Sequence, residues 1–138
     1  LVAGNSYIYE GRSTNASDIS LTWDGKYLYS GRSTTANKIV CGFDGKRIYK
    51  GRSTNSSDIL LTWDGEYLYQ GRSTTASNIL YHWKDKRIYK GRSTNSSDIL
   101  FTIDDKYIYE GRSTTASDIQ FTLSGKIPVA LLIMLLCW

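Results

Sequence analysis

The chain has 138 residues, of which 41% are hydrophobic and 22% charged, and its net charge is +4. This length suffices for one domain with a real core, the composition excludes a disordered chain, and the mild positive charge permits anionic partners without requiring them. Eleven tyrosines, four tryptophans and three phenylalanines stand against a single proline, a balance that favours β-strands over coil.

A 20-residue repeat dominates the sequence. The tetrapeptide Gly-Arg-Ser-Thr recurs without insertion at Gly11, Gly31, Gly51, Gly71, Gly91 and Gly111. A tyrosine lies two residues before each of these glycines, and an isoleucine lies eight residues after it. The residue after the tetrapeptide alternates between Asn and Thr, so a 40-residue period overlies the shorter one and groups the six units as three pairs.

Each unit contains a strand whose apolar residues alternate. In the third unit Ile59, Leu61 and Trp63 are expected to share one face, with Thr62 on the other, because strand side chains alternate with period two. Related trios are Ile19/Leu21/Trp23, Ile79/Tyr81/Trp83 and Ile99/Phe101/Ile103. We expect these isoleucines and aromatic residues to share one interior while the polar bends face outward.

A tight turn follows each of these strands. Asp24-Gly25 and its equivalents in the next two units are predicted to form type I′ hairpin turns, which need positive φ at both central residues. Lys84-Asp85 and Asp104-Asp105 lack glycine at this place, so we expect looser or different turns there. A return strand such as residues 67–69 comes next, and the Gly-Arg-Ser-Thr segment then forms an ordered arc that leads to the next unit.

These elements predict an all-β domain over residues 1–126, built from six tandem strand–arc–strand repeats as an antiparallel hairpin array. The hairpins favour a closed barrel or propeller-like ring, and a β-trefoil-like fold or a β-solenoid are the alternatives. The strand around residues 7–9 and the strand around residues 119–123 lack hairpin partners, so we expect them to pair and close the ring.

Residues 127–138 form an uncharged apolar segment. A membrane-spanning helix needs about 20 apolar residues, so this shorter segment is expected to be a buried cap or plug of the repeat domain. The alternative is a truncated membrane anchor, and contact with a membrane would involve only these residues.

Groups with catalytic or metal-binding chemistry are scarce. The single histidine, His82, replaces Thr or Gly of other units and is interpreted as a substituted surface residue. Cys41 and Cys137 belong to no repeated position and form no Cys-x-x-Cys motif, so their pairing stays open. We expect no catalytic residue, no metal site and no cofactor, and therefore a protein that is not an enzyme.

One arginine per unit is the candidate ligand-binding residue. An ion pair with the aspartate six residues later cannot be the whole explanation, because Lys38 and Asn78 replace that aspartate in two units. The arginine either bonds backbone carbonyls of a neighbouring arc or contacts an acidic or sugar ligand. The six candidates are Arg12, Arg32, Arg52, Arg72, Arg92 and Arg112.

Three functions fit such a repeat. The first is a structural or multivalent binding module for a glycan, a surface or a protein partner. The second is ice binding by a flat ladder of the threonines at Thr14 and its equivalents, which a closed ring would exclude. The third is nucleic-acid binding through Arg beside Tyr, the least expected partner. The location stays open, with secretion or cell-surface display as one expectation.

The pattern Ile-Tyr-x-Gly-x-Ser, followed by Ser-Asp-Ile and Asp-Gly, resembles short-repeat β proteins of bacteria that have no assigned function. The similarity covers about residues 6 to 125. It implies a regular fold and a bacterial origin, and it supplies no catalytic or binding residues. The general plan is also similar to that of repeat lectins, although no lectin sugar motif is present.

Overall fold

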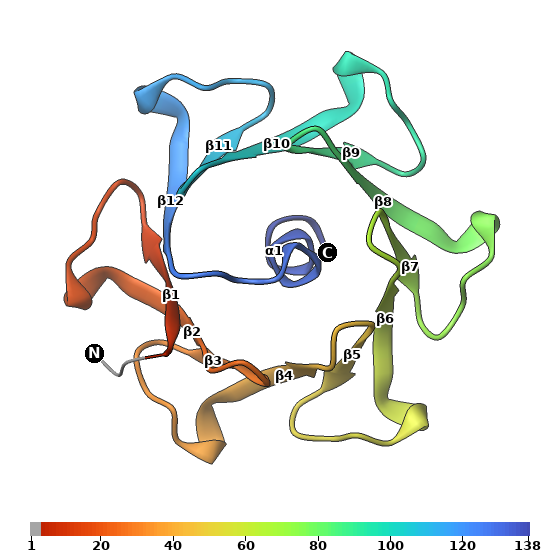
Figure 1. Ribbon diagram of the computed structural model, residues 1–138, viewed down its shortest axis with the longest axis horizontal. Coiled ribbons are helices and arrows are strands. Elements are labelled where there is room, and N and C mark those ends of the chain that lie inside the picture. The colour runs from red at the N-terminus through yellow and green to blue at the C-terminus, as the bar shows by residue number, and fades with distance from the viewer. Residues whose placement is uncertain (1–3) are drawn as a thin grey trace.

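The computed structural model describes residues 4–138, and in this part of the chain twelve strands form a closed antiparallel barrel around one short helix. Viewed along the barrel, six hairpin projections surround the helix like petals (Figure 1). The strands are β1 (Ser6–Glu10), β2 (Ile19–Trp23), β3 (Tyr27–Ser30), β4 (Ile39–Phe43), β5 (Arg47–Lys50), β6 (Ile59–Trp63), β7 (Tyr67–Gln70), β8 (Ile79–Lys84), β9 (Arg87–Lys90), β10 (Ile99–Asp104), β11 (Tyr107–Glu110) and β12 (Ile119–Ser124). The helix, α1, spans Val129–Cys137.

The two ends of the repeat region pair and close the barrel. Strand β1 runs antiparallel to β12, with Tyr7 opposite Ser124 and Glu10 opposite Phe121. Every other strand pairs with its neighbours in sequence. Closure leaves no sheet edge exposed, which removes the surface on which strands of other chains could add. The predicted closed hairpin array is confirmed, and neither the trefoil-like nor the solenoid arrangement occurs.

A β-bulge in each repeat corrects the predicted core face. Ile8 pairs with Leu21, but the next residue, Tyr9, pairs with Ile19, so residue 20 is an extra residue in β2. A bulge shifts the alternation of side chains by one position. Leu21 therefore packs against the interior core, whereas Ile19 packs with the tyrosines on the outer face. The expectation that Ile19 and Leu21 share one interior is wrong.

A buried threonine ties four of the six arcs to the outer face of the barrel. In the first unit, Thr22 has no exposed surface, and its hydroxyl donates a hydrogen bond of 2.7 Å to the carbonyl of Gly31. The same bond recurs from Thr62, Thr102 and Thr122 to the carbonyls of Gly71, Gly111 and Gly11. Because a buried hydroxyl is costly without a partner, this bond stabilises the start of the arc in four units.

The tight turns also differ from the prediction. In the tight turn of the first unit only Gly25 has positive φ, at 102°, and the Asp24 carboxylate accepts hydrogen bonds from the N–H groups of Lys26 and Tyr27. The aspartate side chain, and not a type I′ backbone, therefore shapes the Asp-Gly turn. The turn without glycine at Asp85 and Lys86 has φ of 50° and 69°, the positive pair expected for type I′.

Helix α1 lies at the centre of the barrel and packs against its core (Figure 1). Ala130, Leu131 and Ile133 have no exposed surface. The hydroxyl of Tyr81 on β8 donates a hydrogen bond of 2.7 Å to the carbonyl of Cys137 and so holds the last turn of the helix. Within residues 4–138, no helix has both the length and the apolar character that crossing a bilayer requires.

We expect Tyr81→Phe to lower the free energy of unfolding by about 0.5–1.5 kcal/mol, the usual net value of one such hydrogen bond. The ring keeps its packing, so only the bond to the Cys137 carbonyl is lost. Urea denaturation followed by tryptophan fluorescence measures the change. The same substitution at Tyr107, whose hydroxyl holds no helix carbonyl, is the control, and an equal loss there would refute the anchoring role of Tyr81.

Both cysteines are free thiols. Burial raises the pKa of Cys41 to about 12 and that of Cys137 to about 11. Both side chains therefore stay protonated at neutral pH and pack as small apolar groups against the core.

Candidate functional site

The outer end of each petal is an eight-residue arc, which in the first unit runs over residues 11–18. Gly11 leaves β1 with a φ of +56°, a left-handed conformation that glycine adopts without strain. A 3₁₀ turn over Ala16–Asp18 then leads into β2. The arc is therefore an ordered element, as the sequence predicts.

Serine and aspartate hold the arc in shape. The Ser13 hydroxyl donates a hydrogen bond of 2.6 Å to the Asp18 carboxylate and accepts one of 3.0 Å from the N–H of Asn15. Where Asn78 replaces the aspartate, its amide donates to the Ser73 hydroxyl at 2.7 Å. The carboxylate is thus a structural partner of serine and not of the arginine beside it.

Hydrogen bonds also tune the acidity of this carboxylate in the last unit. Ser113 and Thr115 donate to Asp118, and these bonds hold the pKa of Asp118 below its usual range. The carboxylate is therefore ionised at neutral pH and keeps its hydrogen bonds within the arc.

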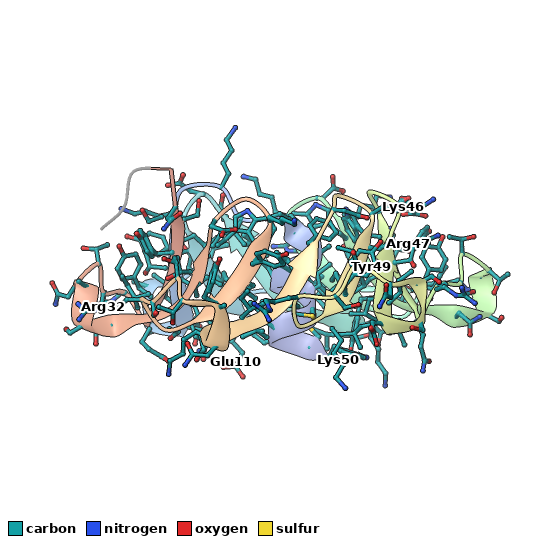
Figure 2. All side chains as sticks on the ribbon, turned by 90° about the horizontal axis from the view of Figure 1, so that it is seen from below. Arg32, Lys46, Arg47, Tyr49, Lys50 and Glu110 are labelled. Carbon is teal, nitrogen blue, oxygen red and sulfur yellow. The ribbon has the colours of Figure 1, made fainter. Side chains whose placement is uncertain are left out.

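All six candidate arginines are exposed, and each lies on a different petal. Figure 2 shows one of them, Arg32, at the outer rim of the molecule. Within residues 4–138, none of the six guanidinium groups makes a hydrogen bond or an ion pair. The residues concerned are Arg12, Arg32, Arg52, Arg72, Arg92 and Arg112. The structure therefore shows no bond to arc carbonyls, and it disperses the six groups around the ring instead of clustering them.

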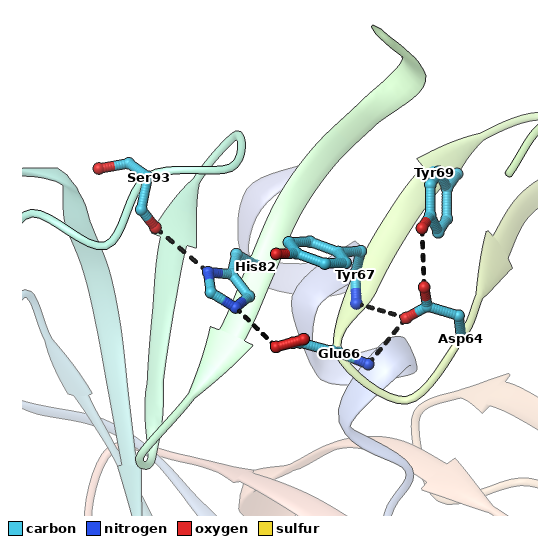
Figure 3. Close-up of polar contacts among 6 residues, drawn as sticks. All are labelled: Asp64, Glu66, Tyr67, Tyr69, His82 and Ser93. Carbon is cyan, nitrogen blue, oxygen red and sulfur yellow. Dashed lines mark hydrogen bonds and ion pairs between the residues drawn. The ribbon is translucent and has the colours of Figure 1, made fainter. Parts of the chain in front are cut away.

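The turns carry a second repeated feature, an aspartate–tyrosine clamp. The Asp64 carboxylate accepts hydrogen bonds from the N–H groups of Glu66 and Tyr67 and from the hydroxyl of Tyr69 (Figure 3). Burial alone would raise the pKa of Asp64, but these hydrogen bonds outweigh it and hold that pKa below its ordinary value. The same carboxylate raises the pKa of Tyr69 to about 12.

This clamp predicts a loss of stability at high pH. In the folded state the pKa of the Tyr69 phenol is about 12, whereas a tyrosine in the unfolded chain has a pKa of about 10. The contribution of Tyr69 to stability is therefore complete below pH 10 and is lost as pH rises through 12. We expect Asp64→Asn to move the Tyr69 pKa towards 10 in an NMR titration of the ring. The control Asp104→Asn, which changes a different turn, should leave this titration unchanged.

His82 corrects the sequence interpretation, because it is buried, with 2% of its surface exposed, and not a surface substitution. It stands where four other units have the buried threonine. Its ring stacks on Tyr67 with the centroids 4.6 Å apart and an interplanar angle of 26°. Nδ1 lies 3.2 Å from the carbonyl oxygen of Ser93, and Nε2 lies 3.3 Å from a carboxylate oxygen of Glu66 (Figure 3).

A cleft that sequence reasoning missed lies at the equivalent place in the second unit. It is lined by Tyr27, Gly42 and Tyr49, by Ser53 and Thr54 of the arc, and by residues of two tight turns at the barrel rim. The signal available in the sequence was the glycine itself: Gly42 stands where four units have threonine. Its importance depends on which side chains face it across the sheet, and the repeat alone does not give them.

Within the described residues 4–138, no group of three or more His, Cys, Asp and Glu side chains is placed to hold a metal ion. Comparison with curated proteins gave no match, and comparison with solved structures gave none. The model of one protein family, described as "6-fold beta flower protein", matches residues 8–132, which is most of the chain. Six petals around a closed barrel are the geometry that this description names, and the chain belongs to the 6-fold beta flower proteins.

Proposed function

We propose that the protein is a non-enzymatic, multivalent binding module whose six arc arginines contact an anionic glycan. The observation that carries this proposal is the exposure of all six guanidinium groups together with their lack of hydrogen-bonded or ionic partners within residues 4–138. A structural role would give at least some of them an acceptor. A residue that is repeated six times without one is available to a ligand.

The chemistry of the arc suits acidic sugars. A guanidinium group binds carboxylate or sulfate groups through two parallel hydrogen bonds, and the threonine two residues later is exposed in every arc and offers a hydroxyl group. Because serine engages the neighbouring aspartate in units such as the first, that carboxylate does not pair with the arginine.

The ring determines how such contacts combine. One arginine on an exposed arc binds a single acidic group weakly, because water screens the interaction. Six arcs on one rigid barrel can hold a polymer at several points, and linked contacts raise the overall affinity by about 10²–10⁴ over one contact. The same dispersal supplies no flat threonine ladder for ice and no continuous positive stripe for nucleic acid, so it favours neither alternative.

The experiment compares binding of the protein to polygalacturonate, to dextran sulfate and to neutral dextran. We expect binding to the two anionic polymers, loss of that binding at high salt, and no binding to neutral dextran. The triple variant Arg12→Gln/Arg52→Gln/Arg92→Gln should bind at least about tenfold more weakly, since it removes half of the linked contacts.

A matched control removes the same charge from the turn end of the barrel through Lys46→Gln, Lys86→Gln and Lys106→Gln. Circular dichroism confirms that both triple variants fold. Retained binding in the lysine variant supports the arcs as the site. Equal losses in the two variants, or no binding of the wild type at low salt, would refute the proposal.

A further inference from the structure

One repeat position on the outer face of the barrel differs among the six units, and in the second unit it lacks a side chain. Four units place a threonine there, the fourth unit places His82, and the second unit places Gly42. The glycine is not required by the backbone, because its φ is not positive. A Cβ atom at Gly42 would lie 3.4 Å from the Tyr27 ring, at the edge of ordinary contact, so a larger residue is not excluded by space.

His82 shows what this place in the fold accommodates. Its imidazole ring stacks on Tyr67 of the neighbouring strand β7. On the other side, Tyr89 of β9 lies beside it, with the centroids of the His82 and Tyr89 rings 5.7 Å apart. The ring edge carrying Nδ1 faces the Ser93 carbonyl of the next arc (Figure 3). The fold therefore forms a slot for a five-membered nitrogen ring, with an aromatic wall and a carbonyl acceptor.

The second unit has the same slot without the ring. Tyr27 and Tyr49 lie opposite Gly42 on the two neighbouring strands, as Tyr67 and Tyr89 lie opposite His82. The Ser53 carbonyl corresponds to that of Ser93, and no N–H or O–H group within residues 4–138 donates to it. Tyr27, Gly42, Tyr49 and Ser53 all line the cleft described above, and its volume of about 750 Å³ is larger than one ring requires.

The charge at the far edge of the slot is reversed between the two units. Lys26 stands at the repeat position of Glu66, and its Nζ lies over the Tyr27 ring, 5.1 Å from the centroid. A ring in this slot would therefore meet a carbonyl acceptor on one edge and an ammonium donor on the other. Neutral imidazole matches this pair, because it carries one N–H donor and one nitrogen acceptor on opposite sides.

We propose that the cleft around Gly42 binds a small molecule that carries a neutral imidazole-type ring. The ring stacks on Tyr27, donates its N–H to the Ser53 carbonyl and accepts a hydrogen bond from the Lys26 ammonium group. The rest of such a ligand extends over the tight turns towards the barrel rim, where Phe43 and Pro128 line the same cleft. This inference does not depend on the glycan-binding role of the arginines.

The test is a titration of the ¹⁵N-labelled protein with imidazole, followed by NMR shifts of the Gly42 and Ser53 amide groups. We expect saturable shifts confined to the cleft, with a dissociation constant in the millimolar range. Pyrrole lacks the acceptor nitrogen and 1-methylimidazole lacks the N–H donor, so each should bind at least tenfold more weakly.

Two variants make the result decisive. Gly42→Thr introduces the side chain that four other units carry and should raise the dissociation constant at least tenfold while the fold stays intact. His82→Gly empties the slot of the fourth unit and should add a second set of imidazole-dependent shifts, at Ser93 and Tyr67. Absence of saturable shifts in the wild type, or unchanged binding by Gly42→Thr, would overturn the proposal whether or not His82→Gly folds.

Discussion

Replacing Leu131 with alanine is expected to lower the free energy of unfolding by about 2–5 kcal/mol. Leu131 has no exposed surface and lies in the part of α1 that the barrel encloses, so the substitution leaves a cavity that the surrounding strands cannot fill. Domains of this size are stable by only about 5–15 kcal/mol, so the loss is a large part of the total. Chemical denaturation followed by circular dichroism and tryptophan fluorescence measures it.

The matched control is Leu136→Ala on the same helix. Leu136 is only partly buried and lies near the end of the barrel, where its removal opens to solvent instead of leaving a closed cavity. We expect a clearly smaller loss there. Equal losses for Leu131→Ala and Leu136→Ala would show that α1 contributes through helix formation and not through the enclosed packing that the structure shows.

Removing residues 1–10 is expected to abolish the monomeric fold. The truncation deletes β1 and thereby unpairs β2 and β12, whose backbone N–H and C=O groups would form two new sheet edges. Exposed edges add strands from other chains, so we expect soluble oligomers or precipitation in place of the monomer. The truncation also removes Ile8, a core residue with 3% of its surface exposed, and so opens the barrel interior to solvent. Size-exclusion chromatography with light scattering measures the change in mass.

Two further samples test the reason for this effect. Removal of residues 1–5 alone leaves β1 in place and should give a monomer. A synthetic peptide of residues 4–10, added during refolding of the truncated chain, should restore part of the monomer by completing the ring. If the chain without β1 stays monomeric and as stable as the wild type, ring closure is not required for the fold.

The architecture could be predicted because it follows from local signals that repeat. Five Asp-Gly or related turns define the hairpins, and the two strands without hairpin partners imply closure between residues 7–9 and 119–123. An apolar tail of this length, next to a barrel that needs a core, favours a cap or plug over a membrane-spanning helix. Each of these inferences uses only period, composition and one pairing rule.

The face of each strand could not be predicted, because the bulge at residue 20 depends on the partner strand. Alternation along residues 19–23 places Ile19 with Leu21, but pairing with Tyr9 turns Ile19 to the outer face. The predicted type of the Asp-Gly turns was wrong for a related reason. Sequence statistics assign Asp-Gly to a type I′ turn, whereas here the Asp24 side chain accepts the turn's N–H groups itself.

The sequence identified the candidate residues but not their contacts. The repeated arginines stand out by spacing alone, yet only the structure shows that Ser13 and not Arg12 engages Asp18. His82 and Gly42 stand out as departures from threonine. The meaning of both became visible only with the tyrosines that face them from neighbouring strands, because these lie 15 and 7 positions away in sequence.

The helix inside the barrel also constrains the number of repeat units in the ring. A single α-helix with its side chains is about 10–12 Å wide, so it fits a ring of one circumference only. Because barrel diameter grows with strand number, we expect a ring of five units to be too narrow for α1 and a ring of seven to leave a gap around it. Gain or loss of a unit would therefore require a different filling at the axis of the barrel.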